Sequence, residues 1–419
     1  MISKQKSQQL VAIVLRATTL ATRFGLMFYL AANLSVLDMG IFGLYSAGVL
    51  LGGGLIPLDV YAHTTRQFLF GGEKSGMILG RHFVFLVLAF FCLLPVAVFL
   101  NLNWGVGQYD FLFWIFIAHL FFEVLSTDIG RLLVPLGRPL ASNVVLFIRT
   151  AFWFFPLIFV FIMGAAAPSL KVVVIAWFFG SFSSVIIGAA WIKFSISGPV
   201  KFYLDCSWMK QALASSACFL IATLLFRVLL GADKYIVGGF LGESAVAIYS
   251  VYASVSLGVL GLIESGVSSW YYPSLVRSVG KKSYGESVVI LKRFFWKNFV
   301  ASFFLMVSIV VFFPVVAKRF LDGVYLEHLD VFYVISLGVF FYCVSMPFHY
   351  YIYSYSEDWK MIVIYAISFL VMIAWSVFYM ADFGVLGGAV MLSLSLISVA
   401  SLRSLFAVGK ILSLGKKYE

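Results

Sequence analysis

Charged side chains inside long apolar stretches are the residues of this sequence that could do chemistry. These stretches are about 20 residues long, the length that a helix needs to cross a bilayer. A charge at a bilayer centre costs about 2.5–3.5 kcal/mol on insertion scales, and such residues mark ion or substrate pathways. The cations of this kind are Arg16, Arg23, Arg149, Arg227, Lys297 and Arg403. The anions are Asp59, Glu123, Asp128 and Glu264.

The cations gather in the half of each stretch nearer to the Lys- and Arg-rich loops, where they would attract an anionic headgroup. Arg16 and Arg23 are seven residues apart, which places them on one helix face. Arg23 lies too deep to reach the membrane surface easily, so we expect it to face a cavity and bind substrate. Arg149, Lys297 and Arg403 lie nearer to helix ends. For these three, extension of the side chain to the interface is an equally good reading.

The acidic residues allow an ion-coupling site, and each also has a structural alternative. His119 and Glu123 share a helix face and both titrate, so they predict either a proton relay or a static hydrogen-bonded pair. Asp128 precedes Arg131 by three residues, which favours a local ion pair. Asp59 and Glu264 end corresponding stretches and are candidates that could equally mark the membrane interface.

Composition predicts an all-α membrane protein. Hydrophobic residues make up 63% of the chain and charged residues 11%, and the mean hydropathy is +1.04. Soluble domains carry about 25% charged residues. Continuous apolar runs favour helices over a barrel, whose strands alternate. We expect twelve spans, at 9–33, 40–62, 82–102, 110–133, 143–163, 170–192, 210–232, 244–268, 294–316, 330–353, 361–381 and 386–407.

Positive charge sets the expected orientation. Most of the 29 Lys and Arg residues lie in the N-terminus, the even-numbered loops and the C-terminus, which puts both termini in the cytoplasm. The net charge of +11 therefore describes topology and attraction to anionic membrane lipid, and we expect no nucleic-acid partner. The four cysteines have no CxxC spacing, so the sequence predicts no metal site and no cofactor.

A weak internal repeat predicts two halves that run in the same direction. IFGLYSAGVLL (41–51) aligns with AVAIYSVYASV (245–255), which pairs Tyr45 with Tyr249. The following loops, 64–81 and 275–293, share length and charge pattern. Parallel repeats of this kind are typical of transporters. We expect six-helix bundles at 1–192 and 210–419 that form a V-shaped cleft, joined by a cytoplasmic hinge at 193–209.

The segment ADKYIVGGFLGESAVAIYSVYAS (232–254) resembles the second-half signature of the polysaccharide flippases, of O-antigen type, in the multidrug/oligosaccharidyl-lipid/polysaccharide exporter superfamily. NLSVLDMGIFGLYSAG (33–48), with Pro57-Leu58-Asp59 and Arg66 after it, is a looser first-half version. The chain departs from the family at Tyr61, where glycine is usual. Span count and loop pattern extend the resemblance over the whole chain.

The resemblance implies a flippase that serves lipopolysaccharide synthesis in the bacterial inner membrane. Its substrate would be an undecaprenyl-pyrophosphate-linked oligosaccharide, moved to the periplasmic leaflet by antiport of protons or another cation. Polysaccharide polymerase and chain-length proteins would be its partners. No GxxxxGK[ST] loop occurs, which excludes an internal ATPase of that type.

Other functions remain open at this stage. A drug/cation antiporter of the same superfamily would need an acidic cavity, which the intramembrane arginines oppose. A peptidoglycan-precursor flippase would usually have fourteen spans. A membrane enzyme of polysaccharide assembly needs positioned carboxylates beside water, and the short loops offer no such pair. We expect that the protein is not an enzyme.

Overall fold

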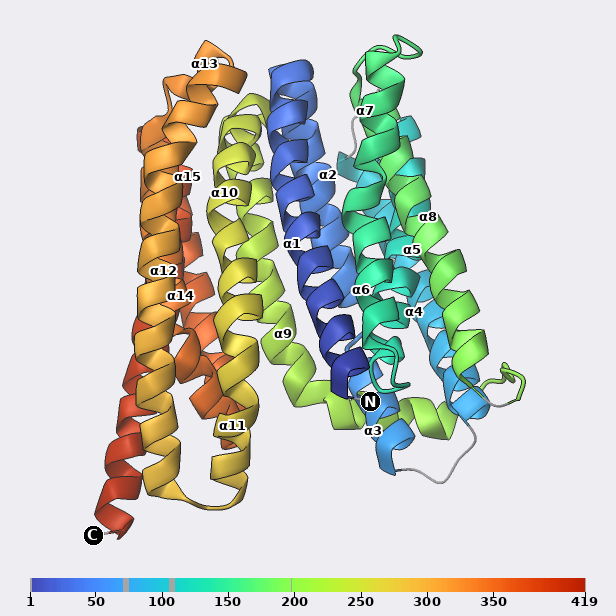
Figure 1. The fold of residues 1–419 in the computed structure, drawn as a ribbon. Coiled ribbons are helices and arrows are strands. Elements are labelled where there is room, and N and C mark those ends of the chain that lie inside the picture. The colour runs from blue at the N-terminus through green and yellow to red at the C-terminus, as the bar shows by residue number, and fades with distance from the viewer. Residues whose placement is uncertain (1, 71–74, 105–109, 197, 419) are drawn as a thin grey trace. The chain divides into compact units, whose positions relative to one another are not determined.

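The computed structural model describes residues 2–70, 75–104, 110–196 and 198–418, and every regular element within them is a helix (Figure 1). The helices are α1 (Ile2–Asn33), α2 (Val36–Leu55), α3 (Tyr61–Phe70), α4 (Ser75–Trp104), α5 (Asp110–Leu133), α6 (Pro139–Phe147), the π-helix η2 (Ile148–Phe152), α7 (Phe154–Ile162), α8 (Leu170–Ser195), α9 (Cys206–Leu241), α10 (Glu243–Ile263), the π-helix η3 (Glu264–Ser268), α11 (Ser269–Gly280), α12 (Tyr284–Phe320), α13 (Gly323–Leu326), α14 (Leu329–Ser354) and α15 (Asp358–Tyr418).

Length and apolarity confirm the all-α membrane prediction. Of the described helices, nine could cross a membrane, and a bent pair within α9 makes ten. Helix α15 covers both of the last expected spans. Its backbone breaks between them at Gly384, where φ is 55° and ψ is −138°. Helix α1 covers the expected first span, although its polar N-terminal turns lower its average apolarity.

The expected second span, 40–62, is wrong at both ends. Helix α2 begins at Val36 and ends at Leu55, seven residues earlier than predicted. Pro57 disfavours helical geometry at the residue before it. Leu58 and Asp59 then adopt positive φ values of 48° and 50°. The chain resumes as the short helix α3, so Asp59 lies in a turn and not within a span.

The described chain forms two compact units. Unit 1 contains 1–26 and 45–224, and unit 2 contains 27–44 and 225–419. Helices α1 and α2 each contribute to both units. The expected linker, 193–209, groups with unit 1, and the chain passes into unit 2 within α9.

In unit 1, α5 packs lengthwise along α8. Glycines on α8 allow the close approach. A Cβ on Gly188 would collide with Ile129 of α5, and one on Gly180 would lie 2.7 Å from the Trp153 ring. This close packing brings polar side chains of α5 and α8 into direct contact with one another between the two helices.

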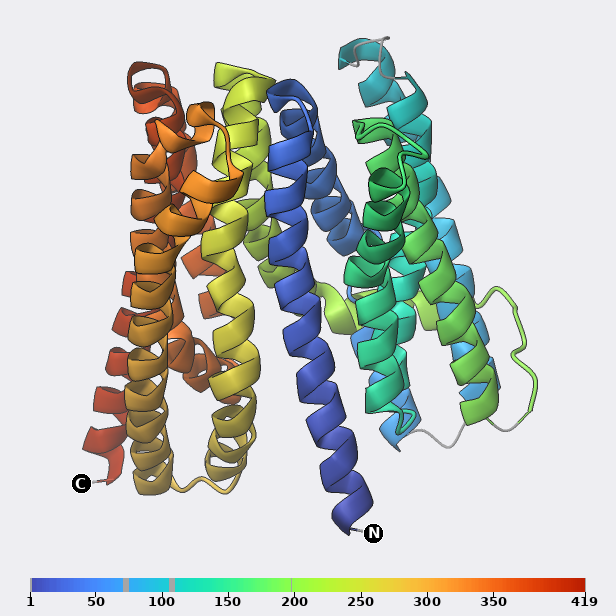
Figure 2. The same ribbon diagram turned by 45° about the horizontal axis from the view of Figure 1, so that its top comes forward.

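In unit 2, α14 packs along both α12 and α15. The orange and gold helices α14 and α12 run side by side in both ribbon views (Figures 1 and 2). Phe313 and Phe332 stack across the α12–α14 contact at 4.2 Å. Gly338 of α14 meets the backbone of Ser393 in α15, where a Cβ would lie 2.5 Å from the Ser393 Cα atom. The core of unit 2 is therefore closely packed around α14.

Residues 199–202, between α8 and α9, approach α4 closely. A Cβ on Gly76 or Gly80 would collide with their backbone, so only glycine permits this approach. Lys201 donates its backbone N–H to the Gly76 carbonyl at 3.2 Å. Arg81 pairs with Asp205 at 3.1 Å. Residues 199–205 are thus attached to α4 of unit 1, and the role of the linker as a hinge stays a prediction.

The turn between α14 and α15 is held by an ion-pair triad. Glu357 accepts hydrogen bonds from Lys360 Nζ at 2.7 Å and Lys410 Nζ at 2.8 Å. Burial alone would raise the pKa of Glu357, but the hydrogen bonds and charges of both lysines hold it below its usual value. A carboxyl whose pKa is lower in the folded state stabilises the fold at neutral pH, and this stabilisation is lost as the pH falls through the folded pKa.

We therefore expect Glu357→Gln to destabilise unit 2 by about 1 kcal/mol or less at pH 7, because the triad is partly exposed. The difference from wild type should vanish once the pH has fallen below the lowered pKa of Glu357 in the folded state, where both chains carry a neutral side chain. Thermal unfolding in detergent at the two pH values measures this. An equal difference at both would show that the triad's charges contribute nothing.

Candidate functional site

Helix α5 carries a polar stripe. His119, Glu123, Thr127 and Arg131 follow one another at four-residue spacing, which places them on one face. His119 is fully buried and Glu123 is 9% exposed. Polar groups buried in this way need partners from other helices. The contacts of this face therefore define the candidate site in unit 1.

Glu123 is the centre of the contacts. Its Oε2 atom accepts a hydrogen bond from the Ser181 hydroxyl of α8 at 2.7 Å. Its Oε1 atom lies 3.5 Å from Arg149 Nε. His119 Nε2 is 3.9 Å from Oε2, too far for a hydrogen bond. The carboxylate therefore contacts an arginine directly and His119 only through Ser181.

The hydrogen bonds around His119 run in one direction. The Ser181 hydroxyl gives its proton to Glu123, so its oxygen accepts from His119 Nε2 at 3.0 Å. His119 Nδ1 then accepts from the Tyr45 hydroxyl of α2 at 2.9 Å. This network assigns neutral His119 with its proton on Nε2. A continuous chain, Tyr45–His119–Ser181–Glu123, leads to the carboxylate.

Arg149 reaches this carboxylate from the π-helix η2. Its Nη1 atom donates to the Thr127 hydroxyl, one turn from Glu123 on α5. Single-turn π-helices interrupt α-helices frequently at functional sites. The alternative that Arg149 extends to the membrane surface is wrong, because its side chain points at α5 and is 13% exposed.

Arg23 and Arg16 add further positive charge to unit 1. The Arg23 side chain keeps accessible surface although protein surrounds it densely, and it senses the charges of both Arg149 and Glu123. Arg16 is exposed, and its Nε donates to Asn143 Oδ1 of α6 at 2.8 Å. The charge of Glu123 thus acts on two arginines, Arg149 in direct contact and Arg23, with Arg16 on the Arg23 face two turns away.

Asp128 belongs to a separate cluster nearer the end of α5. Its Oδ2 lies 3.1 Å from His82 Nε2, and its Oδ1 lies 3.4 Å from Arg131 Nη1, as the three-residue spacing predicts. Arg131 also lies 3.6 Å from Asp59 Oδ1 and over the Tyr61 ring at 4.3 Å. Asp59 and Asp128 thus share one arginine.

Arg403 is enclosed in unit 2. It is 1% exposed, and its Nη2 donates to the hydroxyls of Tyr365 and Tyr342 at 2.7 and 3.1 Å. The guanidinium also lies 4.5 Å from the Tyr342 ring centre. Extension to the interface is therefore wrong for Arg403, which is held by aromatic hydroxyls. Lys297 is exposed on α12, Arg227 is half-buried on α9, and Glu264 is exposed at the start of η3.

The cationic set is divided between the units. Arg16, Arg23 and Arg149 belong to unit 1, and Arg227, Lys297 and Arg403 to unit 2. Arg149 pairs with Glu123 of the candidate coupling set, and Arg23 senses the charge of the same carboxylate. Ser181 and Thr127 were not predicted from the sequence. Single hydroxyl groups are common in apolar helices, and no sequence pattern distinguishes these two.

The second-half motif has a structural contact at its centre. Tyr249 donates its hydroxyl to Asp233 Oδ2 at 2.6 Å, and Lys234 Nζ lies 3.9 Å from Asp233 Oδ1. Asp233 and Tyr249 are both fully buried. The aligned tyrosine of the first half, Tyr45, contacts His119 instead. The repeat thus pairs two buried tyrosines that each bond a titratable side chain.

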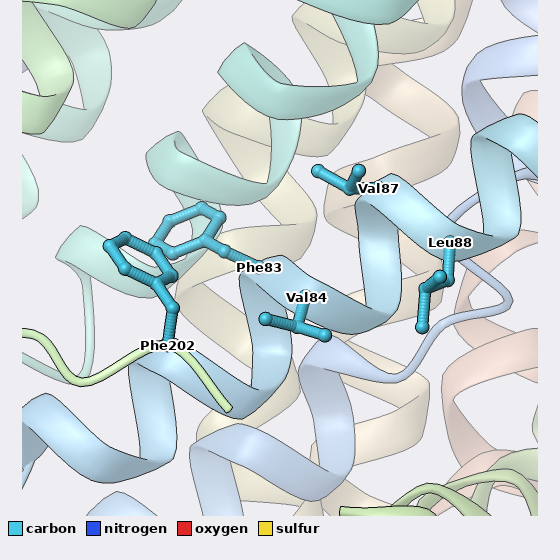
Figure 3. A pocket seen from close by; sticks show the side chains of 5 residues that line it. All are labelled: Phe83, Val84, Val87, Leu88 and Phe202. Carbon is cyan, nitrogen blue, oxygen red and sulfur yellow. The ribbon is translucent and has the colours of Figure 1, made fainter. Parts of the chain in front are cut away.

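An apolar hollow of about 310 Å³ opens on α4. It is lined by Phe83, Val84, Val87 and Leu88, and Phe202 of the linker lies next to Phe83 at its edge (Figure 3). Its walls offer no charged group, so it suits apolar chains rather than ions.

Comparison with known proteins identifies the fold. No family model and no curated protein sequence matches the chain. Among solved structures, an inward-facing multidrug resistance MATE family transporter of the MOP superfamily superposes with a TM-score of 0.76 at 12% identity, over 97% of this chain and 99% of that one. The lipid II flippase MurJ, in an inward closed conformation, gives 0.71 at 14% identity, over 96% and 87%.

A MOP superfamily transporter from Pyrococcus furiosus, described as having reversed binding-pocket polarity, gives a TM-score of 0.59 at 12% identity, over 99% of this chain and 93% of that one. The chain therefore has the fold of MOP superfamily membrane transporters along its whole length. These relatives in fold are transporters and flippases rather than enzymes.

Proposed function

We propose that this protein is a flippase for undecaprenyl-pyrophosphate-linked oligosaccharides, driven by antiport of protons or another cation. It would act in the bacterial inner membrane with both termini in the cytoplasm, and deliver O-antigen-type repeat units to the periplasmic leaflet. Polysaccharide polymerase and chain-length proteins would then receive the product. The two units, 1–192 and 210–419 in the expected division, would alternate access to the substrate.

The excess of arginine over carboxylate in unit 1 carries the proposal. Arg23 and Arg149 both act on Glu123, and one carboxylate neutralises only one of them. The second positive charge remains for an anionic ligand. Guanidinium groups bind phosphate oxygens through paired hydrogen bonds, which suits a pyrophosphate.

The Glu123 network supports the coupling part of the proposal. Glu123 is linked to the His119 imidazole through the Ser181 hydroxyl, and a proton can pass along such a chain of hydrogen bonds. An anionic substrate that binds Arg23 and Arg149 would compete with Glu123 for their positive charge. Proton and substrate would then bind in sequence, and one charge crossing 100 mV supplies about 2.3 kcal/mol.

A drug/cation antiporter is the second candidate, because a MATE transporter gives a high TM-score. An organic cation would have to bind beside Arg23 and Arg149. Like charges at such distances repel strongly in a low-dielectric interior. The Glu123 carboxylate, already paired with Arg149 at 3.5 Å, offers that cation little compensation.

Transport by the purified protein in sealed liposomes tests the proposal. Lipid-linked oligosaccharide from the host would be incorporated, and its outer-leaflet fraction measured by oxidation of the exposed sugars with an impermeant reagent. We expect movement between leaflets that accelerates under an imposed pH gradient. Ethidium transport by the same vesicles, with no movement of the lipid-linked sugar, would instead establish the drug antiporter.

A further inference from the structure

Three tyrosines gather where α11 packs on α14 in unit 2. The rings of Tyr272 and Tyr350 lie 4.9 Å apart, and Tyr272 and Tyr353 lie 5.9 Å apart. Tyr353 is 37% exposed, while Tyr272 and Tyr350 are half-buried. Phe294 of α12 supports the cluster from behind, 6.0 Å from Tyr350. The three rings therefore form a fixed aromatic surface with accessible edges.

Glu264 begins η3, which continues directly into α11, and it precedes Tyr272 by eight residues. It is exposed at the first position of the π-helix η3, and its charge acts on Tyr350. An exposed carboxylate facing lipid would be costly, so this surface meets water or a polar ligand. Both π-helices of the described residues thus carry a charged residue at their first or second position, Arg149 in η2 and Glu264 in η3. Such segments are frequent at functional sites.

Arg403 restricts what can bind there. Its buried guanidinium also acts on Tyr350, with a smaller effect than that of Glu264. A carboxylate with aromatic rings would otherwise attract an organic cation. The positive charge of Arg403 partly offsets the negative charge of Glu264 and so weakens this attraction. A neutral ligand rich in hydroxyl groups meets no such penalty.

We propose that Glu264, Tyr272, Tyr350 and Tyr353 form a subsite for the sugar rings of the substrate. A sugar ring has an apolar C–H face, which can stack on a tyrosine, and hydroxyl groups at its rim. Ionised carboxylates accept hydrogen bonds from such hydroxyls, and tyrosine hydroxyls both donate and accept. This inference rests on the proposed flippase function and assigns the saccharide part of its substrate to unit 2.

Binding of separated substrate parts tests the subsite. The probes are free repeat-unit oligosaccharide, released from the host's lipid-linked pool by mild acid, and undecaprenyl pyrophosphate without sugar. Calorimetry on the full-length protein in detergent would measure both. We expect Glu264→Gln and Tyr350→Leu to weaken oligosaccharide binding at least tenfold and to leave undecaprenyl pyrophosphate binding unchanged. Tyr350→Phe, which keeps the ring, should lose less.

Tyr333→Leu is the matched control, because Tyr333 is a 43% exposed tyrosine on the same helix outside the cluster. It should bind oligosaccharide as wild type does. Unchanged oligosaccharide affinity in folded Glu264→Gln and Tyr350→Leu would overturn the subsite. So would wild-type protein that transports the lipid-linked sugar yet binds no free oligosaccharide, or that binds tetraphenylphosphonium there instead. Selective loss of sugar binding in a protein that transports no lipid-linked sugar would uphold the subsite and refute the flippase function.

Discussion

Arg23→Ala should abolish polysaccharide export while leaving the amount of protein in the membrane unchanged. Arg23 keeps accessible surface beside Arg149 and Glu123, so its loss removes positive charge without opening a packed core. A hydrogen bond from a charged group contributes about 1.5–3 kcal/mol, so the loss of the Arg23 contact with the substrate corresponds to a transport rate lower by at least about 10-fold. The measurement is surface polymer in a cell that lacks a second flippase, with membrane protein levels determined in parallel.

Two further variants sharpen this test. Arg23→Lys keeps the charge but loses the planar pair of donors, so it should restore export only in part. Arg319→Ala removes an exposed positive charge from the end of α12 and should leave export intact. Full export by Arg23→Ala at normal expression would remove Arg23 from the substrate site.

Glu123→Gln should uncouple transport from the pH gradient. The glutamine amide is close in shape to the carboxyl group and can still accept the Ser181 hydrogen bond, but it cannot gain or lose a proton. It also leaves Arg149 without its counter-charge, which favours binding of an anionic substrate. In liposomes, we expect the variant to bind lipid-linked oligosaccharide at least as tightly as wild type. Its transport rate should not respond to an imposed gradient.

Ser126→Ala provides the comparison for this variant. Ser126 lies on the same helix and bonds Ser184 of α8, outside the Glu123 contacts. This variant should keep its response to the gradient. If Glu123→Gln transports with the gradient dependence of wild type, coupling takes place at another carboxylate. Glu264 and Asp128 would then be the next residues to test, although Asp128 is already held by His82 and Arg131.

The sequence predicts the helices better than it predicts the contacts between them. The length of the apolar runs identifies the spans. Within α15, the non-helical backbone at Gly384 separates the two spans that the sequence predicts there. The local pair of Asp128 with Arg131 follows from spacing alone. The end of α2 does not, because the left-handed turn at Leu58 and Asp59 is held by tertiary contacts such as the Arg131–Asp59 pair.

Long cationic side chains mark the limit of that reading. Position along a helix gave Arg149 and Arg403 the same two alternatives. Their outcomes depend on the neighbouring helices, which supply Glu123 to one and two tyrosine hydroxyls to the other. Ser181 joins Glu123 to His119 from 58 residues away in sequence. No periodicity within α5 could indicate that bond.

The polar face of α5 also has a consequence for how the chain is made. Its partners Arg149 and Ser181 lie further along the chain, so α5 leaves the ribosome before either of them does. A lone helix with Glu123 and His119 in lipid would bear the full cost of unpaired polar groups. A newly synthesised α5 is therefore a poor membrane helix by itself. Its polar groups are paired only once Arg149 of η2 and Ser181 of α8 have been inserted. Release of α5 into the bilayer therefore depends on these later segments as well as on α5 itself.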